Sequence, residues 1–293
     1  MQFTIVDTES AYRRILAAPN AAERAAIFQQ ELAAPFSGLV QMMGGDPAVF
    51  TQWVMGPEQL VADRERRQRY LDILAANDAW ARAARALEVG RAAFADHLGR
   101  IPPRDIVFGL FLSDMSAMPI QHGYSGFGAI PGYVMTVYDE PTAANLARIE
   151  ACTIHELHHN LRFRLFPFNL MTTNVADYIV AEGLAEAFAA EQYGEELIGP
   201  WVTEFDESRL EEARAVIGGA LDKSGFNVVR AYIFGDAIAG FSGLEKVGVP
   251  DFAGYAIGYK VVREYQRRTG ATIAEATFEP ASTIIARSGF FEN

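Results

Sequence analysis

The run His-Glu-Leu-His-His, at residues 155–159, constrains this chain more than any other feature. The chain has five histidines among its 293 residues, and three of them fall inside this run. In an α-helix, residues four apart lie on one face about one turn apart, so His155 and His159 can direct their rings at a single ion. The spacing therefore predicts a helix across this segment and a metal ion bound to it.

Glu156 directly follows the first of these histidines and is rotated by about 100° around the helix. It cannot easily join the same coordination shell, but it can hold a water molecule next to the metal. In the H-E-x-x-H arrangement the metal acidifies that water and the glutamate accepts its proton. Zinc is favoured by availability, although other metals accept similar ligands. The alternative is a surface helix with polar side chains, and His158 is expected to pack or to hydrogen-bond outside the ligand shell.

A catalytic zinc usually takes three protein ligands, so a third ligand should lie on another element. The segment 177–191 offers Glu182 and Glu186, which stand one helical turn apart. We expect one zinc ion per chain, with Glu182 as the third ligand. Glu186 is expected to orient one of the histidines through its other ring nitrogen. The alternative is a helix whose glutamates face solvent.

Charge and composition narrow the class of partner. The 37 acidic and 25 basic residues give a net charge of −12, which disfavours binding to nucleic acid or to an anionic membrane. No apolar run approaches the roughly 20 residues of a membrane span, and the first residues lack the pattern of a signal peptide. The single cysteine, Cys152, cannot form an internal disulfide. We expect a cytoplasmic protein, and the oligomeric state is left open.

The pattern along the chain predicts a mostly α-helical α+β protein. From about residue 8 to residue 100, apolar positions return every three or four residues with few breaks. We therefore expect an N-terminal helical region, residues 1–100, packed on a catalytic domain, residues 101–293. Further helices are expected at about 143–166, 174–193, 207–223, 227–240 and 252–268.

Two short apolar runs interrupt the helical pattern. They lie at residues 105–113 and 133–139, are rich in β-favouring residues, and predict strands of a small β-layer. Between them, the stretch at 122–132 contains four glycines, which predict a loop or a hairpin.

The two motifs together resemble a known class of enzyme. HELHH, followed by AEGLAEAF at 181–188, resembles the glutamate-type zincins (gluzincins), in which a second helix supplies a glutamate ligand. The order of motifs, including GYAIGYKVVREYQRRTG at 254–270 and TIIARSGF at 283–290, resembles the DUF2268 family of predicted zinc-dependent proteases.

The resemblance implies a zincin-like metallopeptidase domain with an active-site helix, a glutamate helix and a β-layer. Carried over position by position, it implies that His155 and His159 bind the metal, that Glu156 is the base and that Glu182 is the carboxylate ligand. We expect the strand at 133–139 to bind an extended peptide by edge pairing.

The group that stabilises the oxyanion is less clearly indicated, because no histidine follows His159. Tyr255 and Tyr259 stand four apart on a predicted helix, so a phenol from either could donate to the oxyanion. The alternative is that both are core residues. His122, in the glycine-rich stretch, is a further candidate.

These expectations lead to a zinc-dependent metallopeptidase that acts on peptide bonds. A zinc enzyme of the same fold that acts on a small non-peptide substrate is an alternative, because fold does not decide the substrate. An inactive module that uses the cleft to bind a partner is the third hypothesis.

Overall fold

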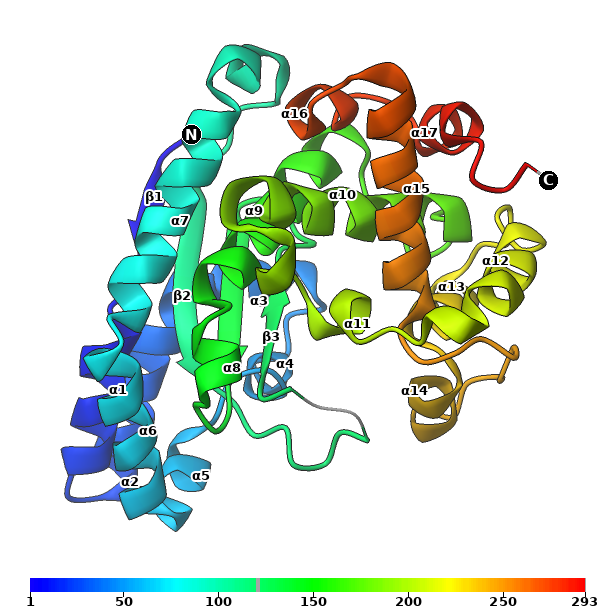
Figure 1. Cartoon of the computed structure of the whole chain (residues 1–293). Coiled ribbons are helices and arrows are strands. Elements are labelled where there is room, and N and C mark those ends of the chain that lie inside the picture. Colours follow the sequence, from blue (N-terminus) through cyan, green and yellow to red (C-terminus); the bar gives the residue numbers. More distant parts are fainter. Residues whose placement is uncertain (120–121, 293) are drawn as a thin grey trace. The chain divides into compact units, whose positions relative to one another are not determined.

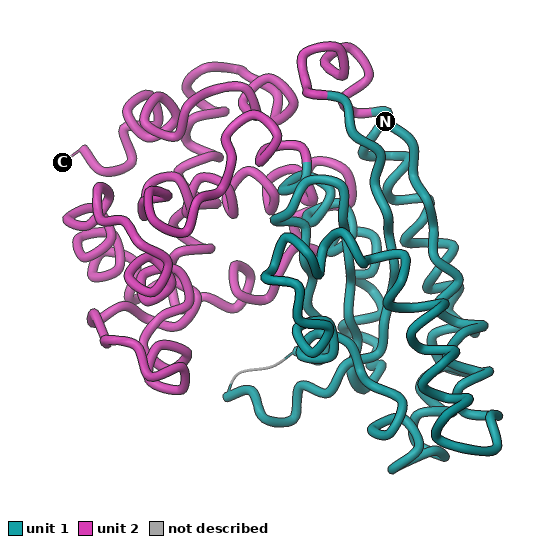
Figure 2. Tube along the Cα trace, turned by 180° about the vertical axis from the view of Figure 1, so that it is seen from behind, with its two compact units in different colours: residues 1–92, 103–160 teal, residues 93–102, 161–293 magenta. Residues whose placement is uncertain are grey.

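The computed structural model describes residues 1–119 and 122–292. The chain forms two compact units (Figure 2), of which unit 1 comprises residues 1–92 and 103–160 and unit 2 comprises residues 93–102 and 161–293. The division expected from the sequence, an N-terminal region at 1–100 and a catalytic domain at 101–293, stays a prediction.

Unit 1 is built on a four-stranded sheet in the order β1-β2-β4-β3 (Figure 1). The strands are β1 (Phe3–Ile5), β2 (Ile106–Leu112), β3 (Tyr124–Phe127) and β4 (Tyr133–Tyr138). β1 and β4 run parallel to β2, whereas β3 runs antiparallel to β4. Phe108 is paired with Ile5 on one side and with Val134 on the other. The predicted small β-layer is confirmed.

The strand order corrects one prediction. β4 lies between β2 and β3, so the strand expected at 133–139 is not an edge strand. The hairpin expected as one alternative for residues 122–132 forms, and its first arm, β3, takes the edge. Gly123 and Gly132 flank the arm with φ of 72° and 100°, which lets the chain turn at both positions. Glycine lowers β-propensity, so the sequence gives no strand signal here.

Unit 1 contains the helices that confirm the helical pattern expected before residue 100, and two more that lie within the segment expected to be helical at 143–166. They are α1 (Thr8–Ala17), α2 (Ala21–Ile27), the π-helix η1 (Phe28–Ala33), the 3₁₀ helix η2 (Ala34–Phe36), α3 (Ser37–Met42), α4 (Ala48–Thr51), α5 (Pro57–Ala62), α6 (Arg64–Ala76), α7 (Ala79–Ala93), α8 (Ala143–Leu146) and α9 (Ile149–Leu165). The short strand β1 precedes them and was not predicted, because three residues are too few to show an alternating pattern.

Helices cover both faces of this sheet. On one face, Phe111 of β2 packs edge-on against Phe36 and Phe50, with ring centroids 5.4 and 5.7 Å away. The other face points toward α9, which in turn packs closely on α7. A Cβ added at Gly90 of α7 would lie only 2.5 Å from the Leu157 side chain of α9. The site helix is thus held in the core of the unit.

Unit 2 is helical among its described residues. Its helices are η3 (Ala95–Arg100), α10 (Val175–Tyr193), η4 (Glu195–Leu197), α11 (Pro200–Thr203), η5 (Glu207–Arg209), α12 (Leu210–Gly218), α13 (Phe226–Phe234), α14 (Asp236–Phe241), α15 (Ala253–Thr269), α16 (Ile273–Ala276) and α17 (Ala281–Ser288). The single helix expected at 227–240 is wrong, because Gly235 has φ of 81° and separates α13 from α14. The helix expected at 207–223 ends earlier, at Gly218.

α10 and α15 pack together through two glycines. A Cβ added at Gly183 would lie 2.1 Å from the carbonyl oxygen of Gly258, and one added at Gly258 would lie 2.0 Å from that of Ile179. The two backbones are therefore in direct contact, which leaves α10 little freedom to shift along or away from α15.

The described part of the molecule is mostly helical with a small mixed sheet, so the α+β class is confirmed. None of its helices is both long enough and apolar enough to cross a membrane.

Candidate metal centre

The HELHH run lies within α9, and this helix is buried rather than exposed. Every residue from 151 to 162 is buried, and the relative exposure of His155 and of His159 is 6%. The alternative of a surface helix with polar side chains is therefore wrong. Burial on all sides also explains why α9 lacks a regular apolar stripe.

The two histidines point their rings at each other. Their Nε2 atoms lie 2.9 Å apart, and the ring centroids lie 4.6 Å apart with the planes at 81°. Two nitrogens bound to one tetrahedral zinc at about 2.0 Å lie about 3.3 Å apart. The rings therefore need little adjustment to share an ion through these atoms.

Glu182 of α10 completes a group that could hold a metal. His155, His159 and Glu182 each offer one ligand atom, and these atoms all lie within 4.8 Å of one another. Glu182 is 5% exposed. A buried carboxylate is costly unless a cation or hydrogen-bond donors compensate its charge. Two imidazoles and one carboxylate are a donor set that zinc accepts, so the residues present fit the ion.

Glu156 lies against the hairpin arm β3. A Cβ added at Gly126 would lie 2.4 Å from both Cγ and Oε1 of Glu156, and one added at Gly128 would lie 2.0 Å from its backbone oxygen. Any larger residue at these two positions would meet the candidate base or its helix. The glycines thus let the edge strand run directly beside Glu156, which is 8% exposed.

Asn160 holds the segment that follows β3, and the sequence did not single it out. Its side-chain Nδ2 donates to the carbonyl oxygens of Gly128, Ile130 and Tyr133 at 3.2, 2.9 and 2.9 Å. Its Oδ1 accepts the backbone N–H of Gly132 at 3.0 Å. One buried amide next to His159 therefore anchors the turn between β3 and β4 to the site helix.

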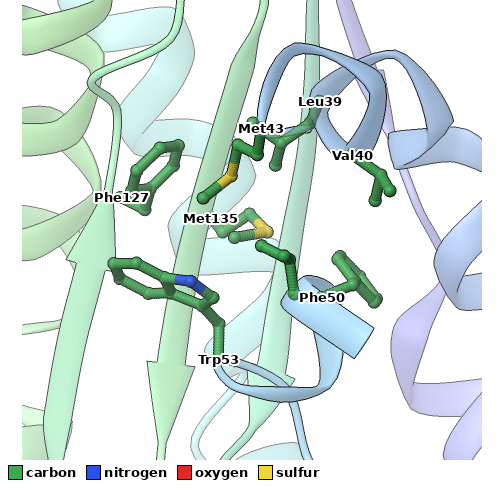
Figure 3. Close-up of a pocket in the computed structure, with 8 residues that line it drawn as sticks. Leu39, Val40, Met43, Phe50, Trp53, Phe127 and Met135 are labelled. Atoms are coloured by element: carbon green, nitrogen blue, oxygen red, sulfur yellow. The ribbon is translucent and has the colours of Figure 1, made fainter. Parts of the chain in front are cut away.

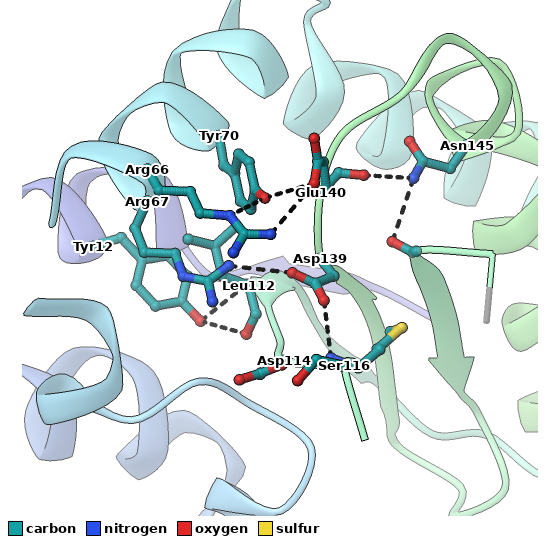
Figure 4. A network of polar contacts seen from close by, with 12 residues as sticks. Tyr12, Arg66, Arg67, Tyr70, Leu112, Asp114, Ser116, Asp139, Glu140 and Asn145 are labelled. Carbon is teal, nitrogen blue, oxygen red and sulfur yellow. Dashed lines mark hydrogen bonds and ion pairs between the residues drawn. The ribbon is translucent and has the colours of Figure 1, made fainter. Parts of the chain in front are cut away.

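The other end of the hairpin has a different set of contacts (Figure 4). Nδ2 of Asn145 donates to the carbonyl oxygen of Glu140 at 2.9 Å. The Asp139 carboxylate accepts from Nη1 of Arg67 at 3.2 Å and from the Met115 N–H at 3.0 Å. The side chains of Arg67 and Asp139 are only 8% and 11% exposed, so their ion pair is buried.

Glu186 lies one turn beyond Glu182 on α10 and is 1% exposed. Its Oε2 accepts the backbone N–H of Gly199 at 3.0 Å, and its Oε1 accepts the indole N–H of Trp201. These contacts fix the carboxylate within unit 2. Its expected role in orienting a ligand histidine stays a prediction.

The two candidate tyrosines lie on α15 in different surroundings. Tyr255 packs in an aromatic cluster, with ring centroids 5.5 Å from Trp201 and 5.9 Å from Phe234. The Tyr259 hydroxyl is buried and has no hydrogen-bond partner among the described residues. Burial raises the pKa of Tyr259 well above its ordinary value, and negative charge from Glu195 adds to the rise. His122 is half-buried, and its role also stays a prediction.

Comparison with known proteins identifies relatives of this chain and the family that it belongs to. The chain is 44% identical over 192 residues to the uncharacterized protein YjfC of Bacillus subtilis, a match that covers 66% of this chain and 64% of the relative. It is 24% identical over 139 residues to the uncharacterized protein YjaZ of the same organism, covering 47% of this chain and 49% of the relative. The chain thus spans less than two thirds of the length of either relative, and no solved structure matches it significantly. A family model described as "Predicted Zn-dependent protease (DUF2268)" matches residues 79–286, so the chain belongs to this family.

Proposed function

We propose that the protein is a zinc-dependent metallopeptidase that hydrolyses peptide bonds. The observation that carries this proposal is the buried group of His155, His159 and Glu182 in a member of a family of predicted zinc-dependent proteases. These three side chains would hold one zinc ion. When bound, the ion supplies Lewis acidity that lowers the pKa of water and polarises a carbonyl.

Glu156 is the residue we assign as general base. It follows His155 on the same helix turn, and its carboxylate lies beside the edge strand, where an extended substrate would pass. It would take a proton from the attacking water and deliver it to the leaving amine, which is how one positioned carboxylate serves both halves of a hydrolysis.

The edge strand β3 is the element we assign to substrate binding. Within the described residues, β3 pairs with β4 on one side and with no strand on the other. A peptide added as a further strand would be held by main-chain hydrogen bonds, and these require only an extended backbone. The contact between Gly126 and Glu156 would then bring that backbone next to the base.

For the oxyanion donor we favour Tyr259 over Tyr255. The Tyr259 hydroxyl is buried with no hydrogen-bond partner in the described part of the chain, so its proton is available to donate. Tyr259→Phe should lower kcat by about a hundredfold, and Tyr255→Phe should have a smaller effect. Equal turnover in wild type and both variants would remove the tyrosines from the mechanism.

Metal content is the first measurement. Elemental mass spectrometry of protein purified without added metal should find one zinc per chain, which His155→Ala and Glu182→Ala should lose. Glu156→Gln should keep the metal and lose nearly all peptidase activity. Protein that takes up no metal even when incubated with zinc would contradict the proposal and favour a binding module.

The substrate class needs a separate comparison. When the enzyme is tested on a panel of peptides and small electrophiles, we expect it to turn over the peptides. The net charge of −12 disfavours nucleic acid as a ligand. Turnover of small electrophiles alone would assign the same centre to a non-peptide substrate.

A further inference from the structure

The edge strand β3 presents different surfaces on its two faces. Side chains in a strand alternate between the faces, and Gly126 points toward α9 and Glu156. Its neighbour Phe127 points to the opposite face, where it is paired with Met135 of β4. The face away from the candidate metal centre therefore carries the larger side chain.

Phe127 lines an apolar pocket on that face (Figure 3). The pocket is formed with Met135 by residues of α3, of α4 and of the turns that follow them, including Met43 and Trp53. The rings of Trp53 and Phe127 meet edge-on, with centroids 5.0 Å apart. Met43, Trp53 and Phe127 are each half-buried, so part of this apolar surface remains open to solvent.

The hydrogen bonds of the hairpin show which backbone groups of β3 face outward. The N–H of Asp139 donates to the carbonyl oxygen of Gly123 at 2.9 Å, so these two residues form a hydrogen-bonded pair. In an antiparallel ladder such pairs alternate, so Ser125 and Phe127 direct their backbone groups at β4. The N–H and C=O of Gly126 then face the free edge, where an added strand would bind.

An added strand would continue the pleat of β3. The residue of the added strand that lies opposite Gly126 would face α9. The next residue of the added strand lies opposite Phe127, so its side chain would lie on the pocket. Directly opposite residues have Cβ atoms about 4.5–5.5 Å apart, which brings such a side chain into contact with the Phe127 ring.

The hollow between these residues has room for about one water molecule, so a side chain would lie across the half-buried faces of Trp53 and Phe127 and would not enter it. We propose that this apolar surface is a specificity subsite for a large apolar side chain of the substrate peptide. That side chain belongs to a residue next to the one that pairs with Gly126. The inference rests on the proposed peptidase function and adds the substrate class, which is an extended peptide with Leu, Met or Phe at this position. The lining side chains named here offer no charge to bind a polar residue.

Peptide libraries randomised at one position at a time test the subsite. Wild-type enzyme should favour Leu, Met or Phe over Asp, Lys or Gly by about tenfold or more in kcat/KM at one position. Trp53→Ala should reduce that preference about tenfold. Ile73→Ala, which removes a 38% exposed apolar side chain from α6, is the matched control and should leave the profile unchanged.

A second variant covers the case in which Trp53→Ala does not fold. Met43→Lys places a cation at the rim of the pocket and should shift the preference at that same position toward Asp and Glu. Cleavage of peptides with no apolar preference, or with a preference that neither variant changes, would overturn the subsite and leave the peptidase intact.

Peptide binding to Glu156→Gln, measured by calorimetry, separates the two proposals. Binding with the apolar preference, without cleavage by the wild type, would retain the subsite and reject the peptidase. Absence of both binding and cleavage for every peptide in the library would reject both.

Discussion

The two ends of the β3–β4 hairpin are anchored by different chemistry. At the end near Gly123, the charged pair of Arg67 and Asp139 is buried beside Asn145. At the end near Tyr133, one neutral side chain, Asn160, makes four hydrogen bonds to the backbone. Both arrangements hold the backbone through buried hydrogen bonds, but only the first uses charge.

The difference follows from what lies nearby. Asn160 is adjacent to His159, a candidate ligand of a divalent cation, so an ionised group there would interact with the proposed metal ion and the proposed base across a low-dielectric core. An amide anchors the turn without adding charge. Placing the buried ion pair at the far end keeps its field away from the candidate metal ligands and Glu156.

We expect the largest effect from a substitution that removes the neutral anchor, Asn160. Asn160→Ala removes one hydrogen bond from each of three carbonyl oxygens and one N–H, so we expect a loss of about 4 kcal/mol in the free energy of unfolding. Urea denaturation measures it. Asn77→Ala is the control, because Asn77 is exposed and its side chain makes one hydrogen bond, to the Ile73 carbonyl at 2.8 Å. A loss as small as that of the control would show that the turn holds without Asn160.

We expect the second largest effect from a substitution in the charged anchor, the pair of Arg67 and Asp139. Arg67→Met leaves the Asp139 carboxylate buried without its cation, so we expect a loss of about 3 kcal/mol. The double variant with Asp139→Asn should recover part of this loss, because the amide oxygen can still accept from Met115. If the double variant is less stable than Arg67→Met alone, the pair does not act through its charge.

Between the anchors, Gly126→Ala should separate stability from activity. The added methyl meets the Glu156 side chain, which can rotate away, so the free energy of unfolding should fall by only about 1 kcal/mol. Peptidase activity should fall by tenfold or more, because the base leaves its position. Unchanged activity with retained fold would contradict the placement of β3 beside the base.

The smallest effect is expected where the charged end reaches the surface. Glu140 is 64% exposed and accepts from Arg66 at 3.3 Å and from the Tyr70 hydroxyl at 3.1 Å. Glu140→Gln should change the free energy of unfolding by about 0.5 kcal/mol or less, since exposed ion pairs contribute little. A loss close to that of Arg67→Met would mean that both pairs act as one network.

The sequence was most informative where local spacing sets the structure. The i, i+4 spacing of His155 and His159 predicted the helix that α9 forms, and the β-favouring runs at 105–113 and 133–139 predicted β2 and β4. Glu182 is buried, as a ligand on an inward-facing helix would be, and its ligand role stays a prediction.

The remaining features depend on residues far apart in the chain. Asn160 binds carbonyls 27 to 32 residues earlier, and no local pattern marks such an amide. β3 contains a glycine because Glu156 occupies the adjacent space, so the requirement comes from tertiary packing and opposes β-propensity. The break at Gly235 is also tertiary, because a side chain there would meet Pro250.

The pairing of β1 with β2 constrains the order in which the protein can fold during synthesis. Phe3 is in register with Ile106, so the first strand has no partner until the ribosome has made about a hundred further residues. The helices between β1 and β2 can form from local contacts before β1 pairs. Closing such a long loop is entropically costly, so the sheet should form late and limit the folding rate.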